Sequence, residues 1–292
     1  AERLATEGFG APEKTSLRKT AYADIPELRQ RLETHLSDLE TKLTPEQRNR
    51  EINRARKEIS QACLDAAKLD PGLFSLTVPT GGGKTLATMR FALAHAESHS
   101  LRRIIVVIPF TSIIEQNASR YSDILGPENV IEHHSNLDPE KRRDLLGERI
   151  TSKQELAAEN WDAPVIVTTT VQFFESLFSN KPSRCRKLHN IIRSVIILDE
   201  VQSLPTQYLF AILDGLQQLA THYGCSIVLS TATPPALRQR ETLPHGLTNV
   251  REIILNPTDL ASRLRRVRYE WPDVDGSPVD WSDLAADVAQ HR

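Results

Sequence analysis

Apolar runs without alternation are the feature that most restricts the fold of this chain. The segments Ile104–Ile108 and Val195–Leu198 contain only Val, Ile and Leu, whereas a strand with one wet face alternates apolar and polar residues. Such runs are typical of parallel strands that are covered on both faces. We expect further strands at 74–78, near 130, and at 164–170, 226–230 and 252–255.

Helical patterns separate most of these expected strands. Residues 86–99 and 112–125 have helical lengths, and Ser112 with Glu115 forms a capping box at the start of the second segment. Further helical signals follow Pro139 and Ser152. The alternation of strands and helices predicts an α/β fold with a mostly parallel sheet over residues 70–257.

Two helices are expected ahead of this domain, over residues 24–69. Asp24 begins the first, Thr44 and Gln47 repeat the start signal, and Asp70-Pro71-Gly72 ends the second. We interpret this pair as a helical connector. Residues 1–23 are interpreted as a linker or the tail of an upstream domain, and residues 258–292 as a linker toward a further domain.

Composition excludes several classes of protein. A formal net charge of −2 excludes a polycationic nucleic-acid coat, although not a local basic groove. The three cysteines lie far apart without a CxxC pair, which argues against a zinc site and favours a reducing cytoplasm. No apolar run approaches the roughly 18 residues of a membrane span. The only methionine is Met89, so we expect this sequence to be an internal piece of a longer protein.

A glycine-rich loop follows the expected strand at 74–78. It consists of Thr80, Gly81, Gly82, Gly83, Lys84 and Thr85, and a helical segment follows directly. A strand, such a loop and a helix are the context of a phosphate-binding Walker A motif. Backbone N–H groups and the helix N-terminus would face phosphate oxygens. We therefore predict an ATP site, with Lys84 at the β- and γ-phosphates and Thr85 on Mg²⁺.

An acidic pair follows the apolar run 195–198. Asp199 would hold Mg²⁺ and Glu200 would orient and deprotonate the attacking water, as in a Walker B motif. Taken alone, an acidic pair at a strand end is equally well explained as a helix cap. Its position downstream of Lys84 favours the catalytic interpretation, and Gln202 completes an Asp-Glu-x-Gln sequence.

These motifs resemble those of superfamily 2 helicases. The loop resembles motif I, Asp199–Gln202 motif II, Thr231-Ala232-Thr233 motif III, Pro109-Phe110-Thr111 motif Ia, and Thr168-Thr169-Thr170 motif Ib. Longer stretches are similar to the CRISPR-associated helicase–nuclease family of type I systems, and within this family to subtype I-C. These stretches are FSLTVPTGGGKTLATMRFALAHA, VIPFTSIIEQNA, IEHHSNLD and ILDEVQSLP. The resemblance covers roughly residues 45–270.

The resemblance implies the first RecA-like domain of an ATP-dependent DNA helicase or translocase in antiviral interference. Thr231 and Thr233 would couple hydrolysis to DNA, while single-stranded DNA would contact Pro109, Phe110, Thr111, Thr168, Thr169 and Thr170. An RNA-guided surveillance complex would recruit the full-length protein. None of the nine histidines precedes an Asp, so the family's nuclease residues, like its arginine fingers, are expected outside this chain.

The sequence leaves alternatives open. The chain could be another superfamily 2 motor, such as a restriction translocase or an RNA helicase, or a nucleotide-dependent switch without motor activity. His133 and His134 are interpreted as a strand-end pair rather than metal ligands, because adjacent side chains of an extended chain point in opposite directions. The basic run of Arg263, Arg265, Arg266 and Arg268 is interpreted as a solvated linker, with a DNA-backbone contact as the alternative.

Overall fold

The computed structural model describes residues 21–134, 156–233, 237–265 and 280–290. Its centre is a seven-stranded sheet in the order β3-β4-β2-β5-β6-β1-β7, in which every pairing between the described strands is parallel. The strands are β1 (Leu73–Thr77), β2 (Arg103–Ile108), β3 (Val130–His133), β4 (Val165–Thr169), β5 (Ser194–Leu198), β6 (Ser226–Thr231) and β7 (Arg251–Glu252). The predicted α/β, RecA-like P-loop architecture is therefore confirmed.

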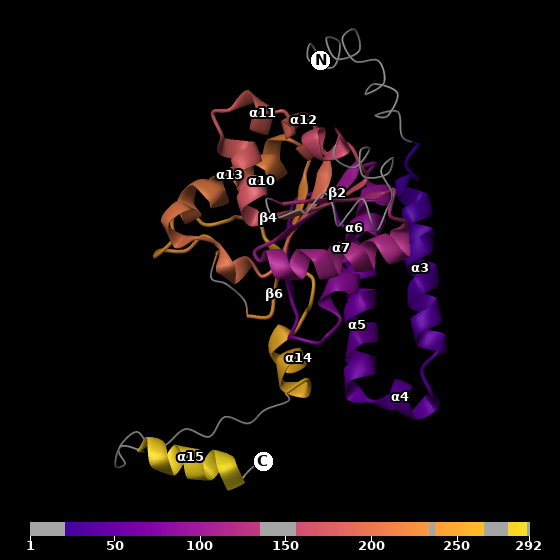
Figure 1. Cartoon of the computed structure of the whole chain (residues 1–292), viewed down its shortest axis with the longest axis vertical. Coiled ribbons are helices and arrows are strands. Elements are labelled where there is room, and N and C mark those ends of the chain that lie inside the picture. Colours follow the sequence, from indigo (N-terminus) through magenta and orange to yellow (C-terminus); the bar gives the residue numbers. More distant parts are fainter. Residues whose placement is uncertain (1–20, 135–155, 234–236, 266–279, 291–292) are drawn as a thin grey trace.

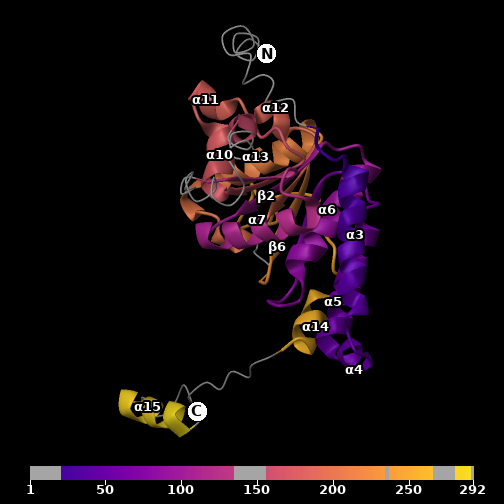
Figure 2. The same cartoon turned by 45° about the vertical axis from the view of Figure 1, so that its right-hand side comes forward.

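Helices cover both faces of the sheet (Figures 1 and 2). One layer consists of α3 (Ile25–Thr41), α5 (Glu51–Ala66), α6 (Lys84–Ser98), α7 (Thr111–Leu125) and α14 (Pro257–Arg263). The other contains α10 (Thr170–Phe178), α12 (Leu188–Ile191) and α13 (Leu209–His222). Shorter or separate elements are α4 (Pro45–Asn49), α11 (Pro182–Cys185), η1 (Val201–Ser203), η2 (Thr206–Tyr208) and α15 (Trp281–Gln290).

Alternate residues of each central strand enter different cores. In β2, Ile104 and Val106 belong to the cluster under α6, whereas Ile105 and Val107 belong to the cluster under α13. Both sets are almost completely buried. This two-sided burial explains why the strand sequences show no alternation of apolar and polar residues.

Two expected boundaries differ from the structure. The helix expected from Thr44 begins with a capping box between Thr44 and Gln47, but extended backbone at Arg50 separates α4 from α5. The strand expected at 252–255 is only two residues long, because the Glu252 carboxylate accepts from Thr77 N–H at 3.1 Å and from Ile254 N–H at 3.3 Å. The helical signals after Pro139 and Ser152 lie largely outside the described residues.

The predicted connector packs tightly on the sheet domain. Leu28 of α3 and Ile59 of α5 are fully buried in the cluster that also holds Met89 of α6. Arg90 of α6 donates two hydrogen bonds to the Glu33 carboxylate of α3, at 2.7 and 2.6 Å. The first two long helices therefore share one core with the sheet.

The basic run at the end of the domain is partly engaged with protein. Arg263 of α14 pairs with Glu51 at 2.7 Å and with Glu58 at 2.8 Å, both on α5, and α14 lies beside α5 in both views (Figures 1 and 2). Arg263 is exposed, as expected of a solvated segment, but it lies in a helix and acidic side chains of α5 hold it. Arg265 is exposed, and Arg266 and Arg268 lie outside the described residues.

Truncation of Ile59 tests whether α5 is part of the core. Ile59→Ala removes a fully buried side chain and is expected to lower the free energy of unfolding by about 2–5 kcal/mol, with one cooperative transition. Urea denaturation followed by circular dichroism measures both. Leu39→Ala in α3, where the side chain is 40% exposed, is the control and should change it by about 0.5 kcal/mol or less. Equal stability of both variants would contradict the shared core.

Candidate nucleotide-binding site

Three strand ends meet at one edge of the sheet. β1 and β6 pair with Thr77 opposite Thr231, and β6 also pairs with β5. The Val78 N–H donates to the Thr231 carbonyl at 3.0 Å, beyond the last residue of β1. Because parallel strands share the direction of their carboxyl ends, the segments that follow β1, β5 and β6 converge there.

The loop after β1 needs glycine for two reasons. Gly81 and Gly83 have φ angles of 83° and 84°, in the left-handed region that side chains disfavour. A Cβ on Gly82 would lie 2.6 Å from Val78 Cγ1. The helix α6 begins at Lys84, two residues earlier than expected from the sequence, so Lys84 and Thr85 lie in its first turn.

A cation and two carboxylates meet beside this loop. Lys84 Nζ lies 2.5 Å from Glu200 Oε1 and 3.4 Å from Asp199 Oδ1. The Ser230 hydroxyl donates to Asp199 Oδ1 at 2.9 Å. An ammonium suits phosphate oxygens, and carboxylates are ligands that Mg²⁺ prefers. The donor set of this edge therefore fits a metal–nucleotide complex.

Glu200 has an unusual backbone conformation. Its φ and ψ of 48° and 50° are left-handed, which is uncommon for a residue other than glycine and is often found at functional sites. Burial raises the pKa of the Glu200 carboxyl, but hydrogen bonds from Lys84 and Gln202 outweigh this effect and lower the pKa below its ordinary value. Glu200 is therefore a carboxylate at neutral pH.

Hydrogen bonds link this carboxylate to the segment after β6. Gln202 Nε2 donates to Glu200 Oε2 at 2.6 Å, and the Thr231 hydroxyl lies 2.7 Å from Gln202 Oε1. The Thr233 N–H donates to the Thr231 hydroxyl oxygen at 3.1 Å. An unbroken chain of polar contacts thus runs from Lys84 through Glu200 to Thr233. We expected these residues from the sequence, but not their contacts.

The residues predicted to contact DNA differ in accessibility. Phe110, two residues beyond the end of β2, is 53% exposed, and Pro109 beside it is half-buried. Thr111 begins α7.

The threonines after β4 serve partly structural purposes. Thr168 is fully buried and its hydroxyl donates to the His133 carbonyl at 2.8 Å, so in this structure the Thr168 side chain has no access to a DNA backbone. The Thr169 hydroxyl accepts from Gln172 N–H at 3.0 Å and caps α10. Thr170 is half-buried in the first turn of α10.

The adjacent histidines have separate partners. The Trp161 indole N–H donates to His133 Nδ1 at 3.3 Å, while His134 Nε2 lies 2.7 Å from the Glu132 carboxylate. Within the described part of the chain, no group of three or more His, Cys, Asp or Glu side chains is placed to hold a metal ion.

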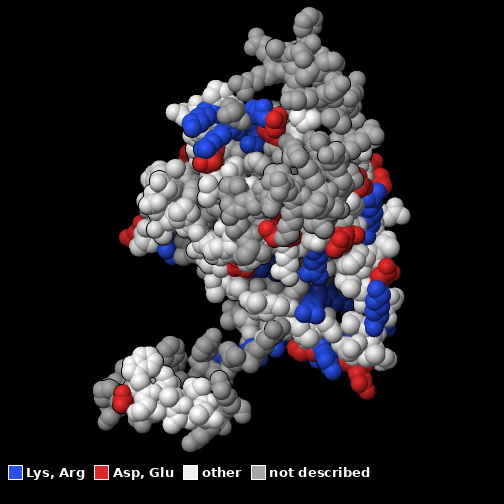
Figure 3. All heavy atoms as spheres, viewed as in Figure 1, with Lys and Arg blue, Asp and Glu red and all other residues white. Residues whose placement is uncertain are grey.

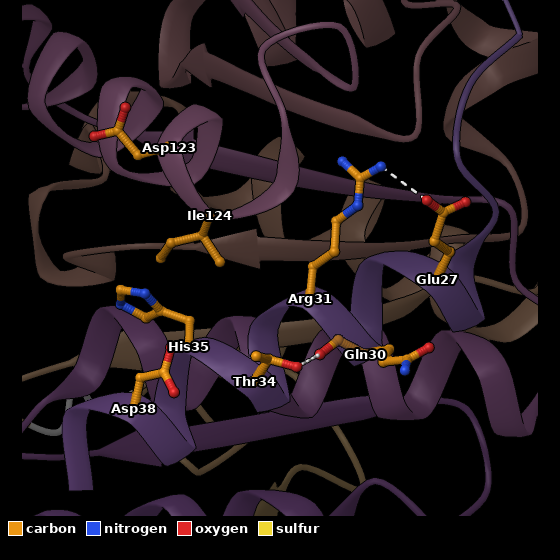
Figure 4. A pocket seen from close by; sticks show the side chains of 8 residues that line it. All are labelled: Glu27, Gln30, Arg31, Thr34, His35, Asp38, Asp123 and Ile124. Carbon is orange, nitrogen blue, oxygen red and sulfur yellow. Dashed lines mark hydrogen bonds and ion pairs between the residues drawn. The ribbon is translucent and has the colours of Figure 1, made fainter. Parts of the chain in front are cut away.

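A groove and a basic patch are formed by residues other than those of this edge of the sheet. A groove of about 490 Å³ between α3 and α7 is lined by residues that include His35, Asp123 and an ion pair of Arg31 with Glu27 (Figure 4). Basic side chains gather over α11 and α12 (Figure 3). Arg184 is among them and pairs with Glu175 at 2.6 Å. Because α12 directly precedes β5, this patch lies toward the amino ends of the strands.

The parallel sheet, the glycine loop and the acidic pair define a P-loop nucleotide-binding domain as the class of protein. A model of the DEAD/DEAH box helicase family matches residues 57–242. The chain belongs to this family. No described helix is long and apolar enough to cross a membrane.

The names of two curated relatives state a further function. The chain is 28% identical over 72% of its length to the CRISPR-associated nuclease/helicase Cas3 of Haloferax volcanii, and 26% identical over 63% to the CRISPR-associated endonuclease/helicase Cas3 of Escherichia coli. It spans 25% and 22% of those proteins. The predicted resemblance is thereby confirmed as homology to Cas3, whereas subtype I-C stays a prediction.

Solved structures with a similar arrangement include two helicases. The ADP complex of T. fusca Cas3 matches with a TM-score of 0.47 at 19% identity, over 63% of this chain and 22% of that chain. The helicase domain of Pyrococcus furiosus Hef matches with a TM-score of 0.46 at 17% identity, over 73% and 41%.

The ion pair of Lys84 and Glu200 predicts a pH-dependent stability. Because the folded state lowers the pKa of Glu200 from its ordinary value of 4.5, the pair stabilises the fold above that value. This stabilisation is lost as the pH falls through the lowered pKa. Wild type should therefore melt at a higher temperature than Glu200→Gln at pH 7, and the difference should shrink as the pH falls below 4.5 and through the lowered pKa.

Calorimetric melting of both proteins across this pH range is the measurement. Glu46→Gln, which changes an exposed carboxylate of α4, should track the wild type throughout. A constant difference in melting temperature between wild type and Glu200→Gln at all pH values would show that the ion pair is not the source of the stability difference.

Proposed function

We propose that this chain is the ATP-binding motor domain of a DNA helicase or translocase of type I CRISPR interference. The observation that carries the proposal is the contact chain Lys84–Glu200–Gln202–Thr231. It joins the phosphate loop to the last residue of β6. A nucleotide switch without motor activity needs no such link, and the names of the relatives favour a CRISPR role over a restriction translocase or an RNA helicase.

The residues of the edge divide the chemistry of ATP hydrolysis among them. The loop from Thr80 to Gly83 and the Lys84 ammonium would hold the phosphates. Thr85 and Asp199 would hold Mg²⁺, which when bound offsets the negative charge of the phosphates. Glu200, ionised at neutral pH, would accept the proton of the attacking water.

Coupling to DNA would use the far end of the contact chain. A shift of Glu200 would move Gln202, and through its hydrogen bonds would move Thr231 and Thr233. Exposed Phe110, with neighbouring backbone N–H groups, would contact single-stranded DNA, mostly through phosphates and without sequence preference.

The wider role rests on homology to Cas3. In the full-length protein, an RNA-guided surveillance complex would load the motor on an R-loop. The motor would then move 3′ to 5′ along the displaced strand for degradation. A cytoplasmic location agrees with the three free cysteines of the described residues.

Removal of Lys84 tests the nucleotide site. Lys84→Ala deletes the cation that faces the phosphates and should weaken ATP binding about tenfold or more. Isothermal titration calorimetry with Mg²⁺-ATP measures the affinity. Lys57→Ala, which removes an exposed lysine of α5, is the matched control and should bind like the wild type. Equal affinities of all three proteins would remove Lys84 from the site.

A second prediction concerns turnover. The family's arginine fingers belong to a second RecA-like domain, and a missing finger typically reduces the rate about 10³–10⁵-fold. Residues 1–292 alone should therefore release phosphate slowly, with little stimulation by single-stranded DNA. A protein extended through the second RecA-like domain, which carries the arginine fingers, should be DNA-stimulated, and Glu200→Gln should abolish its turnover while ATP still binds.

Phosphate release with and without single-stranded DNA compares the two proteins. If residues 1–292 hydrolyse ATP as fast as the extended form, an arginine of this chain supplies the missing charge, and the two-domain account fails.

A further inference from the structure

The phosphate loop is held from outside by an arginine of α5. Arg56 donates to the Gly81 carbonyl through Nε at 3.1 Å and through Nη2 at 3.0 Å. Its third group, Nη1, donates to Asn53 Oδ1 at 3.2 Å. The stem of Arg56 also lies against the loop, since a Cβ on Gly83 would be 3.3 Å from Arg56 Cγ. One side chain thus contacts two of the three loop glycines.

These contacts fix one peptide unit at both ends. The carbonyl of the Gly81–Gly82 peptide accepts from Arg56, while its N–H donates to the Pro79 carbonyl at 3.0 Å. Glycine has the largest backbone freedom to lose. A loop with three consecutive glycines therefore gains most from an external contact that orders it before a ligand binds.

Arg56 projects from a well-anchored helix. Ile59, one turn away on α5, is fully buried in the core, and Glu51 and Glu58 of the same helix pair with Arg263. The Arg56 side chain itself is exposed, so its contacts to Gly81 are not needed to fill the core. A rigid support and an exposed, bidentate contact suit a residue that positions a loop rather than one that stabilises the fold.

We propose that Arg56 is a positioning residue of the nucleotide site, which holds the phosphate loop in its binding conformation in the free protein. The proposal on the loop stands on the geometry alone, and its consequence for ATP rests on the function proposed above. Arg54 offers a matched control on the same helix, because it pairs with Glu51 at 2.7 Å rather than with the loop.

Hydrogen–deuterium exchange of the free protein tests the loop without any nucleotide. Peptides that cover residues 78–86 should exchange faster in Arg56→Ala than in wild type, whereas Arg54→Ala should leave them unchanged. Arg56→Lys, which keeps one donor for the Gly81 carbonyl, should give intermediate exchange. Unchanged exchange of the loop in Arg56→Ala would overturn the proposal, whether or not the chain binds ATP.

Calorimetry then tests the consequence for binding. Arg56→Ala should weaken ATP and ADP by the same factor, about three- to tenfold, with Arg56→Lys close to wild type and an unchanged melting temperature of the free protein. AMP, which lacks the phosphates that the loop would hold, should bind all variants alike. A changed ratio of ATP to GTP affinity would assign Arg56 to the base instead and overturn the positioning role.

The two measurements separate the two proposals. Faster exchange in Arg56→Ala, together with no ATP binding by the wild type, would keep the positioning role and reject the nucleotide site. ATP binding that depends on Lys84 but not on Arg56, with unchanged exchange, would do the reverse.

Discussion

The parallel pairing of β1 with β6 is the constraint on which the site depends. It sets Thr77 opposite Thr231, so that the glycine loop begins where the Thr231–Thr233 segment begins. The neighbouring pairing of β6 with β5 brings Asp199 within reach of the Ser230 hydroxyl. A slip of one residue in either register would turn every side chain of the strand to the other face of the sheet. The burial of both faces of the sheet and the polar contacts at the carboxyl ends of its strands therefore depend on the same register.

The sequence carried most of the fold and the residue types of the site. Unbroken apolar runs identify β2 and β5 because both faces of the sheet are covered, and the Lys84 and Asp199 motifs lie directly after strands. What sequence patterns could not supply were contacts across the fold. Ser230 at a strand end carries no local signal of its bond to Asp199, and the left-handed backbone at Glu200 is visible only in three dimensions.

The contacts of two arginines show even more clearly that sequence patterns do not predict contacts across the fold. Arg263 belongs to a run of basic residues that looks solvated in sequence, yet it meets Glu58 across 205 positions of the chain. Arg56 meets Gly81 across 25 positions. Long, charged side chains find distant partners because a folded core places their helices side by side. Burial of Ile59 thus determines where Arg56 lies, and α5 contacts both the phosphate loop and the last helix of the domain.

The resting ion pair explains how one ligand could act on a distant segment. In the free protein Lys84 serves as the counter-ion of Glu200, and Glu200 in turn holds Gln202. A triphosphate carries more negative charge than one carboxylate and would compete for the Lys84 ammonium. Glu200 would then depend more on Gln202, whose amide oxygen lies against the Thr231 hydroxyl. A change at the phosphates would thus reach Thr231 through side chains that already touch.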